Sequence, residues 1–308
     1  MMIAVFPGQG SQSPGFLAPW LELDGVADRL ARYSDAAGVD LLAAGTEWDA
    51  DRIRDTQIAQ PLIVAASLVS WYALTADGAT TPDGVAGHSI GEIPALVASG
   101  VLSDLDGMRL VGVRGRAMAE AAERVATGMS AVVGGDQDVV LARLAELELT
   151  PSNYNGGGQI VAAGTLDALA RLTAEPPQGS RVIPLAVAGA FHTEFMRSAV
   201  DALREATRTV TPADPALRLW TNRDGSVVTD GAQALDLLVG QVASPVRWDL
   251  CMEAFANDGV SSIVELAPAG TLVGLAKRAL RGTPTVAVKT PDDLDAAREL
   301  LKEREGTR

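Results

Sequence analysis

The sequence predicts an α/β protein in which a large domain with a parallel-sheet core carries a small α+β subdomain as an insertion. Two observations indicate this class. The composition is 47% hydrophobic but only 4% aromatic, which suits closely packed helices and strands better than a β-sandwich. Short buried strands alternate with helices along the chain, and the segments become shorter between Gly128 and Leu185. A chain of 308 residues is long enough to bury one large core and such an insertion.

Composition also argues against several classes of protein. The net charge of -14 disfavours general nucleic-acid binding, which needs clustered Lys and Arg. Cys251 is the only cysteine, so no intrachain disulfide can form, and with two histidines we expect no metal site. Residues 1–6 lack the basic segment of a signal peptide, and we expect no apolar run long enough to cross a bilayer. The expected location is therefore the cytoplasm, with no membrane partner.

The first strand is expected at Met2–Phe6, followed by a glycine-rich loop over residues 7–15. A strand with such a loop suggests a nucleotide site. However, the loop has no Gly-Lys-Ser/Thr sequence, and Ser13 stands where the dinucleotide fingerprint needs its third glycine. Two interpretations remain: the loop brings backbone N–H groups close to a reacting oxygen, or it is a tight turn.

Two helices are expected in the first half of the chain. One is apolar and covers residues 57–76, and the other runs from its N-cap Ser103 to about residue 125. The second helix contains Gly112 and Gly115, and an interior glycine costs about 1 kcal/mol relative to alanine. We infer that another element or a ligand packs closely beside Arg114.

The shorter segments follow the order β-α-β-β-α-β, which is typical of a ferredoxin-like unit. We interpret residues 128–185 as this inserted subdomain, and residues 1–127 with 186–308 as the large α/β domain. The expected strands of the insertion are 129–133, 150–154, 159–163 and 181–185, and its expected helices are 137–147 and 166–173.

Beyond the insertion, longer α/β elements return. The expected strands are 217–221, 261–266 and 285–288, and the expected helices are 194–207, 231–242, 246–257, 270–280 and 292–303.

The segment Gly87-His88-Ser89-Ile90-Gly91 fits the pattern G-x-S-x-G. In this pattern a serine occupies a sharp turn between a strand and a helix, and the glycines relieve its crowding. The unpaired N–H groups and the dipole at the helix N-terminus favour a developing negative charge. Ser89 is therefore a candidate nucleophile on an α/β-hydrolase-like sheet. The alternative is an ordinary helix N-cap serine.

A serine nucleophile usually needs a base, and histidine suits this task best. His88 adjoins Ser89, but consecutive side chains at a strand end point to opposite sides, which leaves His192. The alternative is a loop histidine without a catalytic role. No Asp or Glu is placed as a third member of a triad, and a backbone carbonyl could orient the ring instead.

Five segments match one known family. They are Gly8-Gln9-Gly10-Ser11-Gln12, 87–92, Arg114, Gly189-Ala190-Phe191-His192 and 241–248. In order, spacing and total length they resemble malonyl-CoA:acyl carrier protein transacylases of fatty-acid synthesis and their polyketide-synthase acyltransferase relatives. The resemblance covers essentially the whole chain.

This resemblance implies a catalytic role for several matched residues. Ser89 would take the acyl group from the CoA thioester, and His192 would accept its proton and later protonate the leaving thiolate. The backbone N–H groups of Gln9 and Ile90 would form the oxyanion hole. The main-chain carbonyl of Gln241 would orient the histidine, which would explain the missing acidic residue.

The resemblance also implies how the substrate is recognised. Arg114, rather than Arg109 or Arg116, would pair with the free carboxylate of malonate, because a guanidinium binds a carboxylate bidentately. In the family an aromatic residue just before the histidine accompanies malonyl preference, so Phe191 indicates malonyl. A filled pocket would disfavour an α-methyl group by about 1–3 kcal/mol.

The implied substrates are malonyl-CoA and the phosphopantetheine arm of acyl carrier protein, and no bound cofactor is implied. Carrier proteins are acidic, so a local basic patch is expected, with Lys277, Arg278 and Arg281 as candidates. The alternative for these three residues is a solvated helix face. The three glycines after Asn155 depart from the stiffer sequence usual in the family, so no role is assigned to Asn155.

The expected reaction is a two-step acyl transfer with a malonyl-serine intermediate. The nearest alternative is a free-standing acyltransferase that loads a polyketide-synthase carrier protein. A serine hydrolase is disfavoured, because its chain order would place an acid between serine and histidine and would leave Arg114 unexplained. A catalytically silent carrier-binding module is disfavoured by the intact set of Ser, His and Arg.

Overall fold

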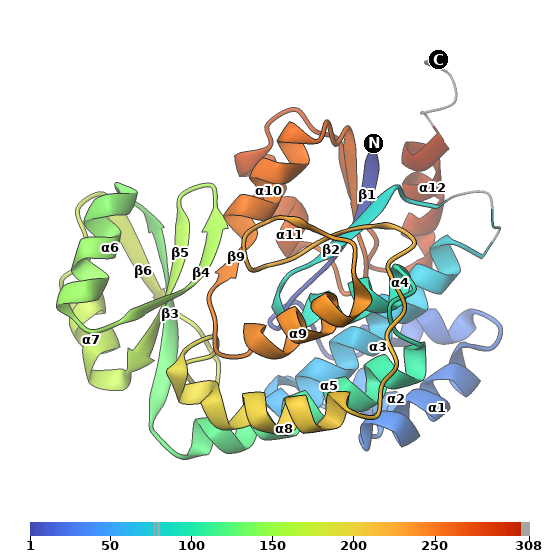
Figure 1. Ribbon diagram of the computed structural model, residues 1–308, viewed down its shortest axis with the longest axis horizontal. Coiled ribbons are helices and arrows are strands. Elements are labelled where there is room, and N and C mark those ends of the chain that lie inside the picture. The colour runs from blue at the N-terminus through green and yellow to red at the C-terminus, as the bar shows by residue number, and fades with distance from the viewer. Residues whose placement is uncertain (77, 79–80, 303–308) are drawn as a thin grey trace.

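The chain folds into two β-sheets surrounded by helices (Figure 1), and the computed structural model describes residues 1–76, 78 and 81–302. The six-stranded sheet contains β1 (Met2–Phe6), β2 (Gly84–Gly87), β7 (Arg218–Trp220), β8 (Val227–Val228), β10 (Ser262–Glu265) and β11 (Thr285–Ala287). The five-stranded sheet contains β3 (Thr127–Gly134), β4 (Thr150–Gly156), β5 (Gln159–Thr165), β6 (Ser180–Pro184) and β9 (Val246–Arg247).

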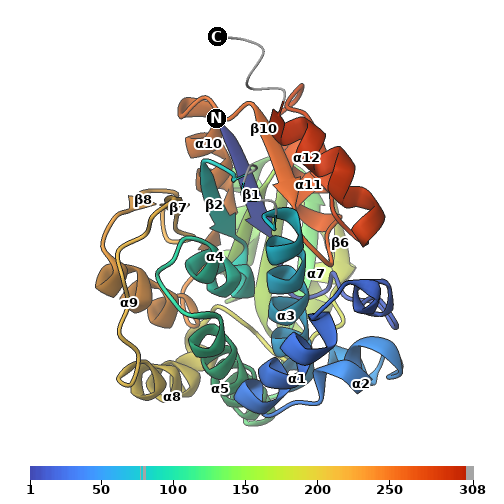
Figure 2. The ribbon, with the colours of Figure 1, turned by 90° about the vertical axis from the view of Figure 1, so that its right-hand side faces the viewer.

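The six-stranded sheet has the order β11-β10-β1-β2-β7-β8, and its neighbours run parallel except for the antiparallel pair β7 and β8. At its centre, Phe6 of β1 lies opposite Gly87 of β2. Because parallel strands end at the same edge of a sheet, the loops after Phe6 and Gly87 leave side by side (Figure 2). This edge carries the glycine-rich loop and the Ser89 turn.

Twelve α-helices cover the sheets in the described part of the chain. Around the six-stranded sheet are α1 (Val26–Ala37), α2 (Leu41–Thr46), α3 (Thr56–Leu74), α4 (Glu92–Ala98), α5 (Asp104–Glu123), α8 (Arg197–Thr207), α9 (Gly231–Gln241), α10 (Trp248–Asn257), α11 (Thr271–Ala279) and α12 (Leu294–Lys302). Helices α6 (Gln137–Glu146) and α7 (Leu166–Ala174) pack on the five-stranded sheet (Figure 1). Short 3-10 helices cover Ala18–Glu22, Arg52–Arg54, Ser89–Gly91, Glu194–Met196 and Pro291–Asp293.

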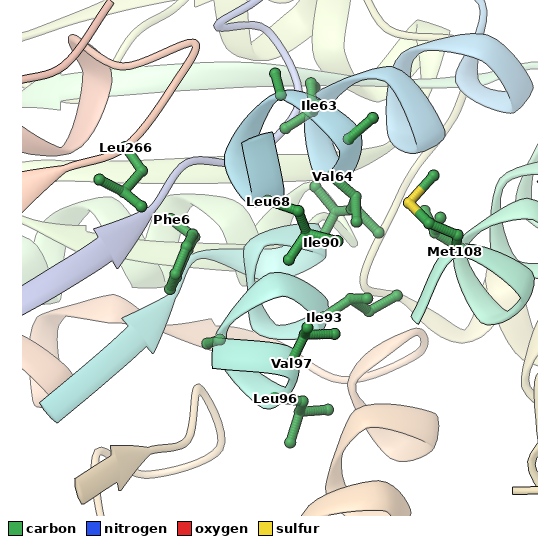
Figure 3. Close-up of a cluster of buried hydrophobic side chains, with 14 of the residues drawn as sticks. Phe6, Ile63, Val64, Leu68, Ile90, Ile93, Leu96, Val97, Met108 and Leu266 are labelled. Carbon is green, nitrogen blue, oxygen red and sulfur yellow. The ribbon is translucent and has the colours of Figure 1, made fainter. Parts of the chain in front are cut away.

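A dense apolar cluster supports the Ser89 turn from below (Figure 3). Ile90 packs next to Leu68 and Val64 of α3, and Ile93 and Phe6 of β1 belong to the same buried cluster. All five side chains are buried. Burial of such a side chain contributes about 1.5–3 kcal/mol relative to exposure, so the turn rests on a rigid base.

Helix α3 corrects one expectation. By length and composition Thr56–Leu74 could cross a membrane, with a mean hydropathy of 1.3, so an apolar run of sufficient length does exist. However, 78% of its most apolar window is buried inside the protein, which is typical of a core helix.

The glycines of α5 are explained by neighbouring helices. A Cβ at Gly112 would lie 2.4 Å from the carbonyl oxygen of Ala37, at the end of α1. A Cβ at Gly115 would lie 3.2 Å from Cα of Gln57, at the start of α3. The close neighbours of these glycines are therefore protein elements.

The five-stranded sheet is built from the segment order β3-α6-β4-β5-α7-β6 and has the strand order β6-β3-β5-β4-β9. Its strands pair antiparallel, except that β9 pairs parallel with β4, with Asn153 opposite Val246 and Tyr154 opposite Arg247. The helix expected from residue 246 is therefore wrong at its first two residues. They extend the sheet as β9, and α10 begins at Trp248.

Other element boundaries also differ from expectation. No element was expected over residues 18–55, where α1 and α2 lie, nor at β8. The helix expected over 57–76 begins at Thr56 and ends at Leu74. The helix expected over 292–303 begins at Leu294, and residue 303 lies outside the described residues.

Candidate active site

The turn after β2 holds Ser89 in a conformation that few residues other than glycine adopt. Its φ is 53°, in the left-handed region. Glycines on both sides are needed because the backbone approaches itself closely. A Cβ at Gly87 would lie 1.9 Å from the carbonyl carbon of Gly91, and a Cβ at Gly91 would lie 2.2 Å from the carbonyl oxygen of Phe6. The motif glycines are therefore required by sterics.

Substitution of Gly87 by alanine is expected to lower the free energy of unfolding by about 3 kcal/mol or more, because the added methyl overlaps main-chain atoms that cannot move aside. Urea denaturation measures the change. Gly274→Ala is the matched control, since a Cβ there meets nothing within 4 Å, and it should be neutral or stabilising by up to about 1 kcal/mol. Equal stability of the two variants would contradict this steric account.

Asn222 lies just after β7, the strand next to β2, and its side-chain amide bonds to the Ser89 turn. Its side-chain Nδ2 donates to the carbonyl oxygen of Gly87 at 2.7 Å, and its Oδ1 accepts from the backbone N–H of Ser89 at 2.7 Å. One amide thus bonds to both arms of the turn. These bonds satisfy polar backbone groups that the sharp turn would otherwise leave unpaired.

His192 lies in the loop after β6, also with a positive φ of 61°. Hydrogen bonds fix this loop on both sides of the ring. The N–H of Ala190 donates to Thr127 Oγ1 at 3.0 Å, and Thr193 Oγ1 donates to the carbonyl oxygen of Ala190 at 2.6 Å. The ring is buried and is held in one place.

The two ring nitrogens of His192 have distinct partners. Nδ1 lies 2.9 Å from the main-chain carbonyl oxygen of Gln241, and Nε2 lies 2.7 Å from Ser89 Oγ. A carbonyl can only accept, so Nδ1 carries the hydrogen and Nε2 accepts from the serine hydroxyl. Burial, followed by the positive charge of Arg114, lowers the pKa of His192 to about 3, so the ring is neutral at neutral pH.

Arg114 of α5 extends its guanidinium to the same serine. Nη2 lies 3.5 Å from Ser89 Oγ and donates to Gln241 Oε1 at 2.9 Å, while Nη1 donates to Gln60 Oε1 at 2.7 Å. The side chain is buried, and its Nε has no hydrogen-bond partner among the described residues. Burial lowers the pKa of Arg114 to about 10, so it remains charged at neutral pH. A buried guanidinium held directly by neutral amides is suited to receive an anion.

Ser89 and His192 line a cavity of about 210 Å³, and its lining residues do not include Arg114 or Gln241. Its lining is part polar and part apolar, and Met118, Met129 and Leu275 are among the apolar residues. Residues expected to shape the site also line it: Gln9, Ser89, Ile90, Phe191 and His192. The cavity therefore joins the glycine-rich loop, the serine turn, the histidine loop and the five-stranded sheet.

His88 lines the cavity but has other partners. Its Nε2 lies 2.8 Å from Asn155 Oδ1, and its ring packs edge-on against Trp248. Asn155 in turn donates to Gln159 Oε1 at 2.9 Å. His88 therefore links the serine turn to the hairpin of β4 and β5.

The basic residues Lys277, Arg278 and Arg281 are exposed at and just beyond the end of α11. The first turn of the same helix contributes Thr271 and Leu272 to the cavity lining. Helix α11 thus connects the cavity, at its first turn, with these three basic residues, at its end.

Sequence reasoning missed Asn222, Gln60 and Glu92. Asn222 follows a parallel strand at the same sheet edge as Ser89, which is a usable signal. Glu92 is a charged residue at the start of an otherwise apolar buried helix, which is also a signal. Gln60 lies within the apolar helix α3, where only its tertiary contact with Arg114 distinguishes it.

Comparison with known proteins agrees with this architecture. The acyl transferase domain family matches residues 3–299. The fold and this match define the class, and the chain belongs to the acyl transferase family.

Within that family, several relatives carry the name malonyl CoA-acyl carrier protein transacylase. The protein of this name from Mycobacterium tuberculosis is 50% identical over 297 residues, which cover 96% of this chain and 98% of the relative. The one from Escherichia coli is 34% identical over 304 residues, with 96% and 98% covered. The crystal structure of MCAT from Mycobacterium tuberculosis has a TM-score of 0.93 at 50% identity and covers 96% of this chain and 99% of that one.

A further solved structure shows a type II PKS acyl-carrier protein in complex with its malonyl-transacylase. The matched chain of that structure is 31% identical to this one and has a TM-score of 0.91. The match covers 97% of this chain and 99% of the matched chain.

Proposed function

We propose that the protein transfers a malonyl group from coenzyme A to the phosphopantetheine thiol of acyl carrier protein, through a malonyl ester of Ser89. One observation carries the proposal: Ser89 Oγ lies 2.7 Å from His192 Nε2 and 3.5 Å from Arg114 Nη2. A nucleophile, a base and a carboxylate-binding group therefore meet at one oxygen atom. The shared name of the relatives supports the same donor and acceptor.

In the loading step, Ser89 Oγ attacks the thioester carbonyl carbon while its proton passes to His192 Nε2. The backbone N–H groups of Gln9 and Ile90 stabilise the resulting oxyanion. The C–S bond then breaks, and His192 returns the proton to the CoA thiolate. In the second step the carrier thiol gives its proton to His192 and attacks the ester carbonyl; the C–O bond then breaks, and His192 passes the proton to Ser89 Oγ.

Substrate binding strengthens the base. A pKa of about 3 makes His192 a weak proton acceptor, and the charge of Arg114 is one cause of this low value. A malonyl carboxylate that pairs with Arg114 offsets that charge and raises the pKa of His192. The site is therefore better prepared for reaction when the bound acyl group carries a free carboxylate.

Phe191 supports a preference for malonyl over branched acyl groups, because its buried ring lines the cavity beside His192. Phe191→Ser is expected to improve methylmalonyl loading relative to malonyl loading by about tenfold. The ratio is measured as the two acyl-enzyme masses formed in competition. An unchanged ratio would contradict the steric account of Phe191.

The carrier protein is proposed to dock at Lys277, Arg278 and Arg281. Reversing these charges to glutamate is expected to raise the KM for the carrier several-fold and to leave malonyl-CoA hydrolysis unchanged, because only the carrier carries the complementary acidic surface. Arg208→Glu, at the exposed C-cap of α8, is the control, because helices α8 and α11 are well separated in Figure 1. Equal carrier kinetics in both variants would place the docking surface elsewhere.

The comparisons favour fatty-acid synthesis over the loading of a polyketide synthase. The relatives at 50% identity are named as transacylases without a polyketide partner, whereas the structure with a PKS carrier is 31% identical. Membership of the acyl transferase family also disfavours the serine hydrolase alternative.

The finer description of the fold belongs to the same proposal. The strand order β6-β3-β5-β4 supports a ferredoxin-like subdomain at residues 128–185, inserted into an α/β-hydrolase-like domain of residues 1–127 and 186–308. We propose a cytoplasmic enzyme that needs no bound cofactor, since acyl transfer between thiols involves no net oxidation.

The proposed function is tested by incubating the protein with malonyl-CoA and phosphopantetheinylated carrier protein, and following the carrier by mass. Malonyl-carrier is expected to form at the rate at which free CoA appears. Release of CoA with free malonate and no malonyl-carrier would identify a hydrolase and would overturn the proposal.

A further inference from the structure

Glu92, three residues after Ser89, is a buried carboxylate that no step above uses. It is the first residue of α4 and is 6% exposed. Neither Glu92 nor Arg114 is among the residues that line the cavity, but Arg114 Nη2 lies 3.5 Å from Ser89 Oγ, whereas both oxygens of Glu92 are bonded to other protein groups. A buried carboxylate is unfavourable unless it is paired or hydrogen-bonded, so its partners indicate its role.

Both carboxylate oxygens of Glu92 are occupied by residues that hold the site. Oε1 accepts from the backbone N–H of Asn222 at 2.6 Å, and Oε2 accepts from Gln241 Nε2 at 2.5 Å. Asn222 holds the Ser89 turn, and Gln241 contacts both Arg114 and His192. Through Asn222 and Gln241, the Glu92 carboxylate is therefore linked to the groups that hold Ser89, His192 and Arg114.

The contact with Gln241 decides which end of its amide faces Arg114. Nε2 of Gln241 faces three oxygens: Glu92 Oε2, Ser89 O at 3.0 Å and Asn222 Oδ1 at 3.3 Å. The amide oxygen is left to accept from Arg114 Nη2. The reverse orientation would place acceptors against acceptors on one side and two donors against each other at Arg114.

The ionised form of Glu92 is the one that can accept at both oxygens. Burial raises the pKa of Glu92 to about 7, whereas the Asn222 N–H, the charge of Arg114 and the Gln241 amide act in the opposite direction. The charged and titratable groups that face Glu92 are Arg114 from α5 and the buried thiol of Cys251 from α10. The donors limit this rise, and Glu92 takes the ionised form that accepts at both oxygens as the pH rises above about 7.

We propose that Glu92 is a positioning residue for malonyl recognition, which orients Gln241 and through it aims Arg114 at the substrate carboxylate. This inference rests on the proposed function.

Glu92→Gln tests it, because the near-isosteric amide cannot accept at both positions. The Asn222 donor is a main-chain group and cannot turn away, so the new NH2 faces Gln241 Nε2 and displaces that side chain. We expect the KM for malonyl-CoA to rise by roughly tenfold, with kcat within about threefold of wild type. We expect KM to change more than kcat because His192 is held by the main-chain carbonyl of Gln241, which the substitution leaves in place.

Glu92→Met is the matched control. It loses both hydrogen bonds but places no donor against Gln241, whose amide keeps Ser89 O and Asn222 Oδ1 as acceptors. A smaller rise in KM than for Glu92→Gln is expected, even if Glu92→Met unfolds at a lower temperature. A purely structural role predicts the reverse order, and that order would overturn the proposal.

One measurement needs no variant at Glu92, and so applies even if Glu92→Gln does not fold. The NMR signals of the Gln241 side-chain amide are assigned by their loss in Gln241→Leu. We expect its hydrogens to exchange slowly with water and its chemical shifts to change when malonate is added. An amide that exchanges as freely as that of an exposed glutamine would overturn the proposal.

The wild-type protein alone shows whether a negative result refutes the role of Glu92 or the proposed function itself. If wild type forms a malonyl adduct that Ser89→Ala lacks, an unchanged KM in Glu92→Gln refutes only the role of Glu92. If wild type forms no adduct, the proposed function itself is refuted, and the role of Glu92 with it.

Discussion

Replacement of His192 by alanine is expected to slow malonyl transfer by about 10³-fold, the largest loss we expect outside Ser89 itself. The variant removes the imidazole 2.7 Å from Ser89 Oγ, which we propose accepts the serine proton and later protonates the leaving thiolate. Steady-state transfer to the carrier protein measures the loss.

His88→Ala is the matched control, because the chain has two histidines and His88 is directed to Asn155 instead. It is expected to retain far more activity than His192→Ala. Similar losses in both variants, or a His192→Ala protein with near wild-type transfer, would contradict the assignment of the base.

Replacement of Arg114 by alanine is expected to lower kcat/KM for malonyl-CoA by about 10²-fold, because two charge-assisted hydrogen bonds to the free carboxylate are lost. Loading from acetyl-CoA, which lacks that carboxylate, should fall much less. Arg114→Lys keeps the charge but not the planar fork, and should lie between alanine and wild type.

Arg109→Ala provides the comparison on the same helix. The side chain of Arg109 is 56% exposed and pairs with Asp106, whereas Arg114 is buried beside Ser89. Its removal should leave malonyl kinetics unchanged. An equal decline of malonyl and acetyl loading in Arg114→Ala would show that Arg114 only maintains the structure of the site.

Local sequence patterns anticipate much of the fold. β1 has the expected bounds Met2–Phe6 and ends where the apolar run ends, and α5 begins after its cap Ser103, whose Oγ accepts from the N–H of Asp106. Helix α1 was missed although its buried residues Val26, Leu30, Tyr33 and Ala37 have helical spacing, so its signal was present. β9 carries no such signal, because two residues become a strand only by pairing with β4, some ninety residues earlier in the chain.

Some residues of the candidate site can likewise be predicted from local sequence, and others cannot. Ser89 follows from the steric demands of a strand-to-helix turn, and His192 follows by elimination between two histidines. The choice of Arg114 over its neighbours rested on the family resemblance, since burial next to Ser89 is a property of the folded protein. Asn222 and Gln241 act through single side-chain amides whose partners lie more than a hundred residues away. A local pattern can place Asn222 at the sheet edge, but it does not encode these contacts.

In the proposed reaction Ser89 carries the malonyl group between the two thiols. The intact mass of the protein after brief exposure to malonyl-CoA, measured for wild type and Ser89→Ala, tests this role. One added malonyl group is expected on wild type and none on Ser89→Ala, and the added mass should be lost on mixing with phosphopantetheinylated carrier protein. An adduct that persists in Ser89→Ala, or rapid transfer by that variant, would contradict it.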